Sequence, residues 1–219
     1  MIIGYILLAI AIVEIIIGIN LLFKYQKSLS TLFFGLFCFS AAIYVGANGV
    51  AYAQSSYNAL CEAFAWVGGS LATAFFFAFS FSFPHPKKTL AELAPWIIWP
   101  IVVFVPSILF TDEIIVHKPE YQIGTVYNNV IGPMFWLFLV MFFVYWGWAL
   151  VNFIRYYRKS SGYYRMFVRI LLTGIVVSLI SSSIFDIFLP MFMKSGFGYI
   201  GSLLTSVWVI GAGYLMVKK

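Results

Sequence analysis

Three acidic residues, Glu14, Glu62 and Asp186, lie inside long apolar runs of this 219-residue chain. An ionisable side chain in such a run is costly in lipid, so each is by default a functional candidate. At about 1.5 Å per residue of helix, Glu14 lies slightly past the middle of its run. Glu62 lies near the beginning of its run and Asp186 near the end. The chemistry available to such carboxylates is ligand binding or the movement of an ion.

Asn48 sits at a depth similar to that of Glu62 and Asp186, so the three could share one polar pocket. Trp66 and Tyr52 are close to them by depth. A pocket between helices with a few converging polar groups is typical of a small-molecule site. The alternative is that each polar group is satisfied locally, or that Glu62 faces lipid headgroups.

Pro190 follows Asp186 by four residues. A proline inside a helix lacks the N–H that would bond to the carbonyl four residues earlier, here that of Asp186 itself. The run Ser181-Ser182-Ser183 lies one turn before it. We therefore expect a kink that acts as a hinge at Pro190, with a static kink as the alternative.

Several other chemistries are excluded. His85 and His117 fall on opposite membrane faces, so they cannot share a metal ion. Cys38 and Cys61 are expected at opposite depths, beyond the reach of about 7 Å that a disulfide tolerates. Residues 197–217 contain no lysine that could form a retinal Schiff base. With no motif of a zinc protease, phosphate-binding loop or serine hydrolase, we expect no catalytic residue, metal or cofactor.

The composition predicts which solvent surrounds the chain. Hydrophobic residues make up 63% of it and charged residues 9%, whereas soluble domains have about 45–50% and about 25%. The net charge of +6 comes from basic residues placed between apolar runs. They are therefore interpreted as topology signals, and no nucleic-acid partner is expected. The chain is predicted to be an integral membrane protein in contact with the lipid bilayer.

Seven apolar runs are each long enough for a spanning helix, which needs about 20 residues. They are too long for the strands of a membrane β-barrel. We therefore predict an all-α membrane protein, a seven-transmembrane helix bundle that forms a single domain over residues 1–219. The expected helices cover residues 2–23, 29–53, 59–83, 93–110, 130–154, 166–192 and 197–217.

Eleven of the 13 Lys and Arg residues lie at one face of such a bundle, in the loops after helices 1, 3 and 5 and at the C-terminus. Because Lys and Arg collect on the cytoplasmic side, the N-terminus is predicted outside and the C-terminus in the cytoplasm. The expected location is the plasma membrane.

The one long external loop, residues 111–129, contains two β-prone runs around Lys118-Pro119-Glu120. This pattern predicts a short extracellular β-hairpin between helices 4 and 5. The hairpin would either cover the outer mouth of the bundle as a lid or serve only as a connector.

A family resemblance rests on the second half of the chain. It lies in the hairpin-like loop that leads into residues 127–136, in the basic link of residues 155–159 and 164–169, and in Gly174 with the segment Asp186 to Pro190. In this order of features the chain resembles the seven-helix region at the N-terminus of many bacterial and archaeal sensor histidine kinases. The resemblance implies a sensory role, with an outer or intramembrane input passed to a cytoplasmic effector after helix 7.

The expected function is a non-enzymatic sensor or receptor module that detects a small molecule or a membrane property. The chain stops at Lys219, so we expect no kinase catalytic domain in it. The expected partners are an unknown small ligand and a cytoplasmic effector such as a kinase, and a homodimer is left open. The main alternative is a small transporter or channel that uses Glu14 and Asp186.

Overall fold

The computed structural model describes residues 2–24, 28–53, 59–111, 115–116, 130–188 and 198–218, without the side chains of a few of them, Asp186 included. Within these ranges, seven helical stretches are long and apolar enough to cross a membrane, which confirms the predicted fold class at this level. The helices are α1 (Ile2–Lys24), α2 (Leu29–Ala53), α3 (Ala59–Ser82), α4 (Leu90–Phe110), α5 (Phe135–Lys159), α6 (Gly162–Ser181) with the π-helix η1 (Ser182–Phe188), and α8 (Gly198–Lys218).

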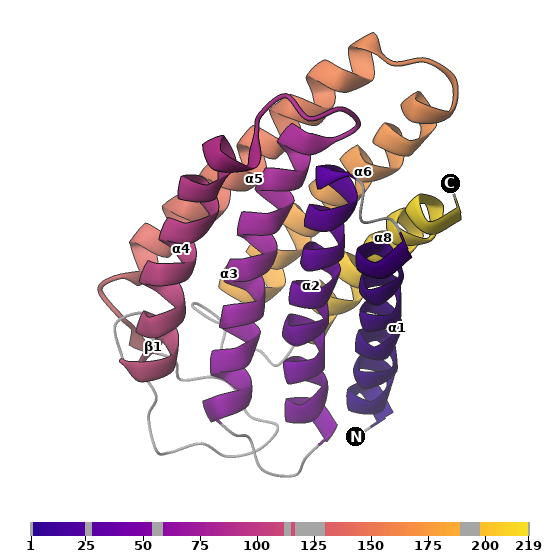
Figure 1. Ribbon diagram of the computed structural model, residues 1–219. Coiled ribbons are helices and arrows are strands. Elements are labelled where there is room, and N and C mark those ends of the chain that lie inside the picture. The colour runs from indigo at the N-terminus through magenta and orange to yellow at the C-terminus, as the bar shows by residue number, and fades with distance from the viewer. Residues whose placement is uncertain are drawn as a thin grey trace.

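The helices form one bundle in which α3 is central (Figure 1). Helix α3 contacts α2, α4 and α5, and α1 packs on the other side of α2. Helix α8 contacts α1, α2, α6 and η1, and α5 contacts α6, so the ring of helices closes. The central helix is also the more buried one: 67% of the apolar stretch of α3 is buried, against 28% of that of α4.

Aromatic side chains fill the middle of the bundle. The ring of Phe76 on α3 lies 4.9 Å from that of Phe37 on α2 and 4.8 Å from that of Trp146 on α5, centroid to centroid. Trp208 of α8 meets Phe76 edge-on at 5.5 Å. Such pairs contribute beyond their buried area, and here they join four helices at one point.

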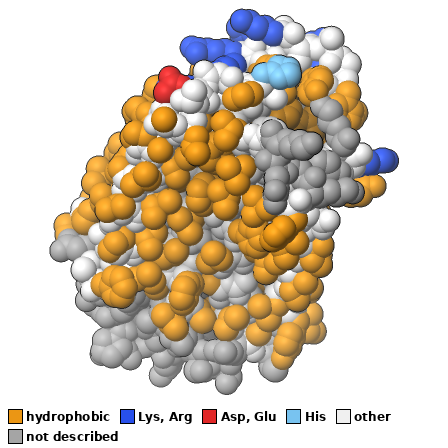
Figure 2. Space-filling view, viewed as in Figure 1, with side chains coloured by type: hydrophobic (Ala, Val, Ile, Leu, Met, Phe, Trp, Pro, Cys, Tyr) orange, Lys and Arg blue, Asp and Glu red, His pale blue; other side chains and the backbone are white. Residues whose placement is uncertain are grey.

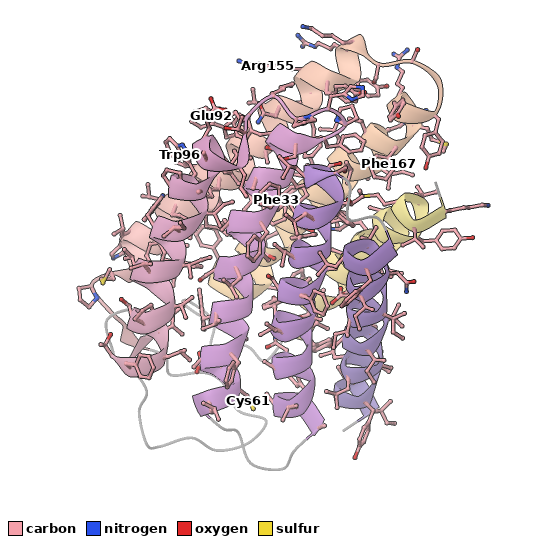
Figure 3. The ribbon with its side chains drawn as sticks, in the orientation of Figure 1. Phe33, Cys61, Glu92, Trp96, Arg155 and Phe167 are labelled. Carbon is pink, nitrogen blue, oxygen red and sulfur yellow. The ribbon has the colours of Figure 1, made fainter. Side chains whose placement is uncertain are left out.

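The face shown in Figure 2 is largely apolar where its side chains are described, and most of the Lys and Arg in view gather at its top. Large side chains such as Ile2 and Val207 are 78% and 70% exposed. In water this would be an aggregation surface, but it is the surface that lipid requires. Arg155 and Glu92 lie at one end of the bundle and Cys61 at the other (Figure 3). Which end faces the cytoplasm stays a prediction.

Helix α5 begins and ends later than predicted. It covers Phe135–Lys159 rather than residues 130–154. Gly132 and Pro133 separate it from residues 130–131, which form a strand instead. At its other end the helix continues through Arg155. A long basic side chain can keep its charged head in water while its stem lies along apolar surface, so an arginine does not have to end the helix.

Helices α4 and α6, by contrast, begin earlier than predicted. Helix α6 begins at Gly162 rather than at residue 166, and Gly162 has a φ of +56°, which glycine adopts without steric cost. Helix α4 begins at Leu90 rather than at residue 93. Thr89 and Glu92 form a capping box there, in which the Thr89 N–H donates to Oε2 of Glu92 at 2.7 Å. The box satisfies two N–H groups at the helix start.

The sixth span was predicted as one helix over residues 166–192. The α-helix instead ends at Ser181 and continues as the π-helix η1 to Phe188. Pro190 lies outside the described residues, so the hinge stays a prediction. The change of helix type coincides with the serine run, and π-helical turns are frequent at functional sites.

The predicted extracellular hairpin is not supported as drawn from the sequence. Strands β1 (Ile115–Val116) and β2 (Val130–Ile131) pair antiparallel, with Ile115 opposite Ile131. The second strand thus lies after the run that was expected to pair. The Pro119 turn and that run lie outside the described residues.

Candidate functional site

Two of the six candidate residues meet at α8. The side-chain amide of Asn48 on α2 donates to the hydroxyl of Ser202 on α8 at 3.2 Å and to the backbone carbonyl of Tyr44 at 3.0 Å. One turn along α2, the ring of Tyr52 meets that of Tyr199 on α8 edge-on, at 5.6 Å between centroids. These contacts fix how α2 and α8 lie against each other.

Trp66 faces a different part of the bundle. Its ring packs edge-on against those of Phe135 and Phe138 on α5, at 5.8 and 5.2 Å between centroids. Glu62 precedes Trp66 by one turn of α3 and is buried. The structure therefore brings Asn48 and Tyr52 together at α8 and turns Trp66 towards α5.

Asp186 belongs to η1, but its side chain is outside the described part of the structure. The π-helix packs against α8. The backbone that carries Asp186 is therefore next to the same helix that contacts Asn48, although no contact of its carboxyl group can be assigned.

Glu14 is fully buried on α1. The hydroxyl of Ser206 on α8 lies close to the carboxyl group, and Cys38 of α2 is near enough to interact with it electrostatically. Within the described ranges, neither carboxyl oxygen of Glu14 meets hydrogen-bond geometry with any partner, and the same holds for the hydroxyls of Thr205 and Ser206. Buried polar groups in proteins are nearly always paired, so three such residues in one region call for an explanation.

These polar groups lie between two apolar clusters. On one side is a small cluster that includes Leu7 and Ala11 of α1 with Leu203 of α8. On the other side is the main aromatic core, which includes Leu21 of α1 and Val209 of α8. Along both α1 and α8 the polar positions separate the two clusters. In the low dielectric of the bundle interior, polar groups that lack partners are costly.

The polar residues of α8 were not among the sequence candidates. Ser202 and Ser206 are one turn apart with Thr205 between them, and they are 0%, 1% and 9% exposed. Their spacing of three and four residues places them on one face of the helix. That pattern was available in the sequence, but hydroxyls cost far less in lipid than acids do and so stand out less.

A second set of buried polar pairs joins α3 to α5. The indole N–H of Trp146 donates to Thr73 Oγ1 at 3.1 Å, and the amide of Asn152 donates to Ser80 Oγ at 3.1 Å. Every polar atom named here has its partner in the neighbouring helix, which is typical of contacts that hold a membrane bundle together.

A cavity of about 280 Å³ lies at the end of the bundle where the basic residues gather. It is bordered by Thr31 of α2, by Phe83 and Pro84 after α3, by Phe167 of α6 and by Met216 of α8. Next to it, the Tyr163 hydroxyl of α6 donates to the Leu215 carbonyl of α8 at 3.1 Å. The last turn of α8 therefore borders this cavity.

In the described ranges, no group of three His, Cys, Asp or Glu side chains could hold a metal ion. Cys38 and Cys61 are free thiols, and Cys38 is buried. The polar side chains around α8 can form hydrogen bonds with a ligand, and the carboxyl group of Glu14 can bind a proton.

Comparison with known families tests the resemblance seen in the sequence. Residues 6–214 match the family described as the N-terminal 7TM region of histidine kinase. The chain belongs to this family. No curated protein matches it.

Membership identifies this seven-transmembrane histidine-kinase region as a sensor module. The matched residues correspond to the membrane region of these kinases and not to a catalytic domain. The seven spans make it a multi-pass protein of the plasma membrane, surrounded by lipid. A cytoplasmic kinase is the partner that membership implies for the full protein.

Proposed function

We propose that this sensor region detects a small molecule or a membrane property and signals to a cytoplasmic effector through a change in the position of α8. The observation that carries the proposal is that α8 contacts α1, α2, α6 and η1, and that buried polar side chains of α1 and α2 converge on it. Asn48 is bonded to α8 directly and Glu14 faces it. A change at any of these polar groups therefore acts first on α8.

The bundle must have two arrangements for such a signal to exist. A stimulus shifts the balance only by interacting better with one of them. In the arrangement seen here, α8 is held to α2 by Asn48 and Ser202 and to α6 by Trp208, whose indole N–H donates to the Ser178 hydroxyl. A second arrangement would exchange these few polar contacts, which lie across an apolar interface where each is worth about 0.6 kcal/mol on average.

The output end is proposed to be the one with the cavity and the basic residues. Movement of α8 along its axis would change the Tyr163–Leu215 contact and the wall of the cavity that Met216 forms. The Lys and Arg distribution supports a cytoplasmic location for this end and an outer location for the N-terminus.

Distance measurements on α8 test this proposal. Spin labels at Val102→Cys on α4 and Tyr214→Cys on α8, both exposed positions, would be placed in a chain with Cys38→Ala and Cys61→Ala. The probes are a pH series and vesicles of dimyristoyl or dioleoyl phosphatidylcholine. We expect two distance populations whose ratio changes with at least one probe; a single unchanged population throughout contradicts the proposal.

Asn48→Ala and Asp186→Asn should each change the ratio of the two populations without unfolding the bundle. Asn152→Ala is the matched control, because its amide donates a hydrogen bond to Ser80 of α3 rather than to a residue of α8. Flux of ions or solutes across liposomes containing the protein would favour the transporter alternative, since a sensor needs none.

A further inference from the structure

The Glu14 carboxyl group lies in an environment that offers no compensating charge. It is 0% exposed, and α1 packs against α2 and α8. The apolar parts of these three helices, residues 2–23, 29–53 and 198–217, contain no Lys, Arg or His, and Glu14 is their only acid. The titratable group that faces it from α2 is the Cys38 thiol, and from α8 it faces the hydroxyl of Ser206.

An ionised carboxylate cannot be held cheaply in this place. Desolvating a charge without a partner costs several kcal/mol, whereas a neutral carboxylic acid costs much less and gains an O–H donor. The Ser206 oxygen beside the carboxyl group has no other partner among the described residues, so it is available to accept from that donor. A proton on the carboxyl group would supply this pair with the donor that a carboxylate lacks.

We propose that Glu14, with Ser206 opposite it, is a proton-binding site in the membrane interior, and that its occupancy controls the contact between α1 and α8. Insofar as this names the stimulus, it rests on the proposed sensor function. The ligand is a proton. Its binding makes the O–H bond of the Glu14 carboxylic acid, and its release to water leaves a carboxylate.

The packing around the site makes the two protonation states structurally different. A Cβ atom on Gly213 of α8 would lie 2.5 Å from Ile17 of α1. The two helices are therefore in close contact one turn after Glu14 along α1. On the α2 side, a Cβ on Gly18, one turn after Glu14, would lie 3.1 Å from the ring of Phe39. Water cannot reach a newly formed carboxylate unless α8 moves away from α1. Loss of the proton therefore favours an arrangement in which α8 lies further from α1.

Infrared difference spectroscopy on the full chain in lipid nanodiscs tests the site directly. The carbonyl stretching band of a protonated carboxylic acid should be present at neutral pH, disappear as the pH is raised, and be missing in Glu14→Gln. Glu92→Gln is the matched control, because Glu92 is an exposed acid in the capping box of α4 and its removal should leave the band unchanged. A band that is absent, or that persists in Glu14→Gln, overturns the proposal.

Two further measurements keep the test decisive if Glu14→Gln does not fold. Ser206→Ala should shift the frequency of the band, because it removes the acceptor, whereas Ser70→Ala, whose hydroxyl donates within α3 to the Trp66 carbonyl, should not. Replacing choline chloride by sodium chloride should leave the pH range over which the band disappears unchanged. A displacement by sodium would overturn the proton assignment in favour of an alkali-cation site.

Together, the infrared band and the spin-label distances show whether the proton site or the sensor proposal has failed. If the band titrates but the α8 distances of the spin-labelled chain never change, the proton site stands and the relay through α8 fails. If the distances respond to bilayer thickness while no titrating band exists, the sensor proposal stands and the proton site fails. A proton-driven sensor requires that both change over the same pH range, and that the distances in Glu14→Gln no longer depend on pH.

Discussion

The Tyr145 hydroxyl of α5 donates a 2.7 Å hydrogen bond to the backbone carbonyl of Trp96 on α4. Pro100 stands four residues after Trp96 and has no N–H, so this carbonyl lacks its usual helical donor. The indole N–H of Trp99 donates to the same hydroxyl at 2.7 Å. A side chain of α5 therefore supplies the donor that is missing at Pro100, one of the three prolines inside α4.

Tyr145→Phe should destabilise the protein by about 1–3 kcal/mol, because it leaves the Trp96 carbonyl and the Trp99 indole without their partner. The stacking of this ring on Phe77, at 4.2 Å between centroids, would be kept. The measurement is unfolding by sodium dodecyl sulfate in dodecylmaltoside micelles. In a Pro100→Ala background, where the helix supplies its own N–H, the cost of Tyr145→Phe should fall; equal costs in both backgrounds contradict this account.

Gly174→Ala should loosen α6 from α8. A Cβ atom at Gly174 would lie 2.4 Å from the ring of the buried Trp208, whose N–H is bonded to Ser178. The ring cannot move without breaking that bond, and overpacking of this kind costs about 1–3 kcal/mol. Gly147→Ala on α5 is the control, because a Cβ there meets nothing within 4 Å. The same unfolding assay should show a loss for the first variant and little change for the second.

The hydrogen bond between Asn152 and Ser80 should show a measurable coupling across α3 and α5. A double-mutant cycle of Asn152→Ala and Ser80→Ala is expected to give about 0.6 kcal/mol, the average for hydrogen bonds within a membrane bundle, and no more than about 1.7 kcal/mol. A second cycle with Ser70→Ala in place of Ser80→Ala should be additive, because the Ser70 hydroxyl bonds within its own helix. Coupling of the same size in both cycles would show that the effect is not due to this contact.

The number of spanning helices could be predicted because the apolar layer demands a fixed length of helix. The helix ends could not be predicted as well, for reasons seen at particular residues. Arg155 was taken as the end of a helix, but it marks only the end of apolar burial, and α5 continues to Lys159. The early start of α4 was readable from Thr89 and Glu92, whose spacing is that of a capping box.

The site could be predicted only in part, because depth in the membrane says nothing about which face of a helix a residue occupies. Asn48 and Trp66 are at similar depths, yet one bonds to α8 and the other packs on α5. The missing information is the order of helices around the bundle, which places α8 beside α1 and α2. Only then do Ser202 and Ser206 become neighbours of Asn48 and Glu14.

The sidedness predicted from Lys and Arg can be tested with two cysteine variants. Thr111 at the end of α4 and Ser161 at the end of α5 are both exposed, and they lie at opposite ends of the bundle. In a Cys38→Ala, Cys61→Ala background, an impermeant maleimide should label Thr111→Cys in whole cells. It should label Ser161→Cys only after the membrane is opened, because the basic link beside Ser161 is expected to stay in the cytoplasm.

Both cysteines should react equally in detergent, which controls for their local exposure. The opposite pattern in whole cells would invert the bundle and place the cavity bordered by Met216 on the outer side. It would also remove the proposed route from α8 to a cytoplasmic effector. The Glu14 site would be unaffected by such an inversion, because its lack of a counter-charge depends on α1, α2 and α8 alone.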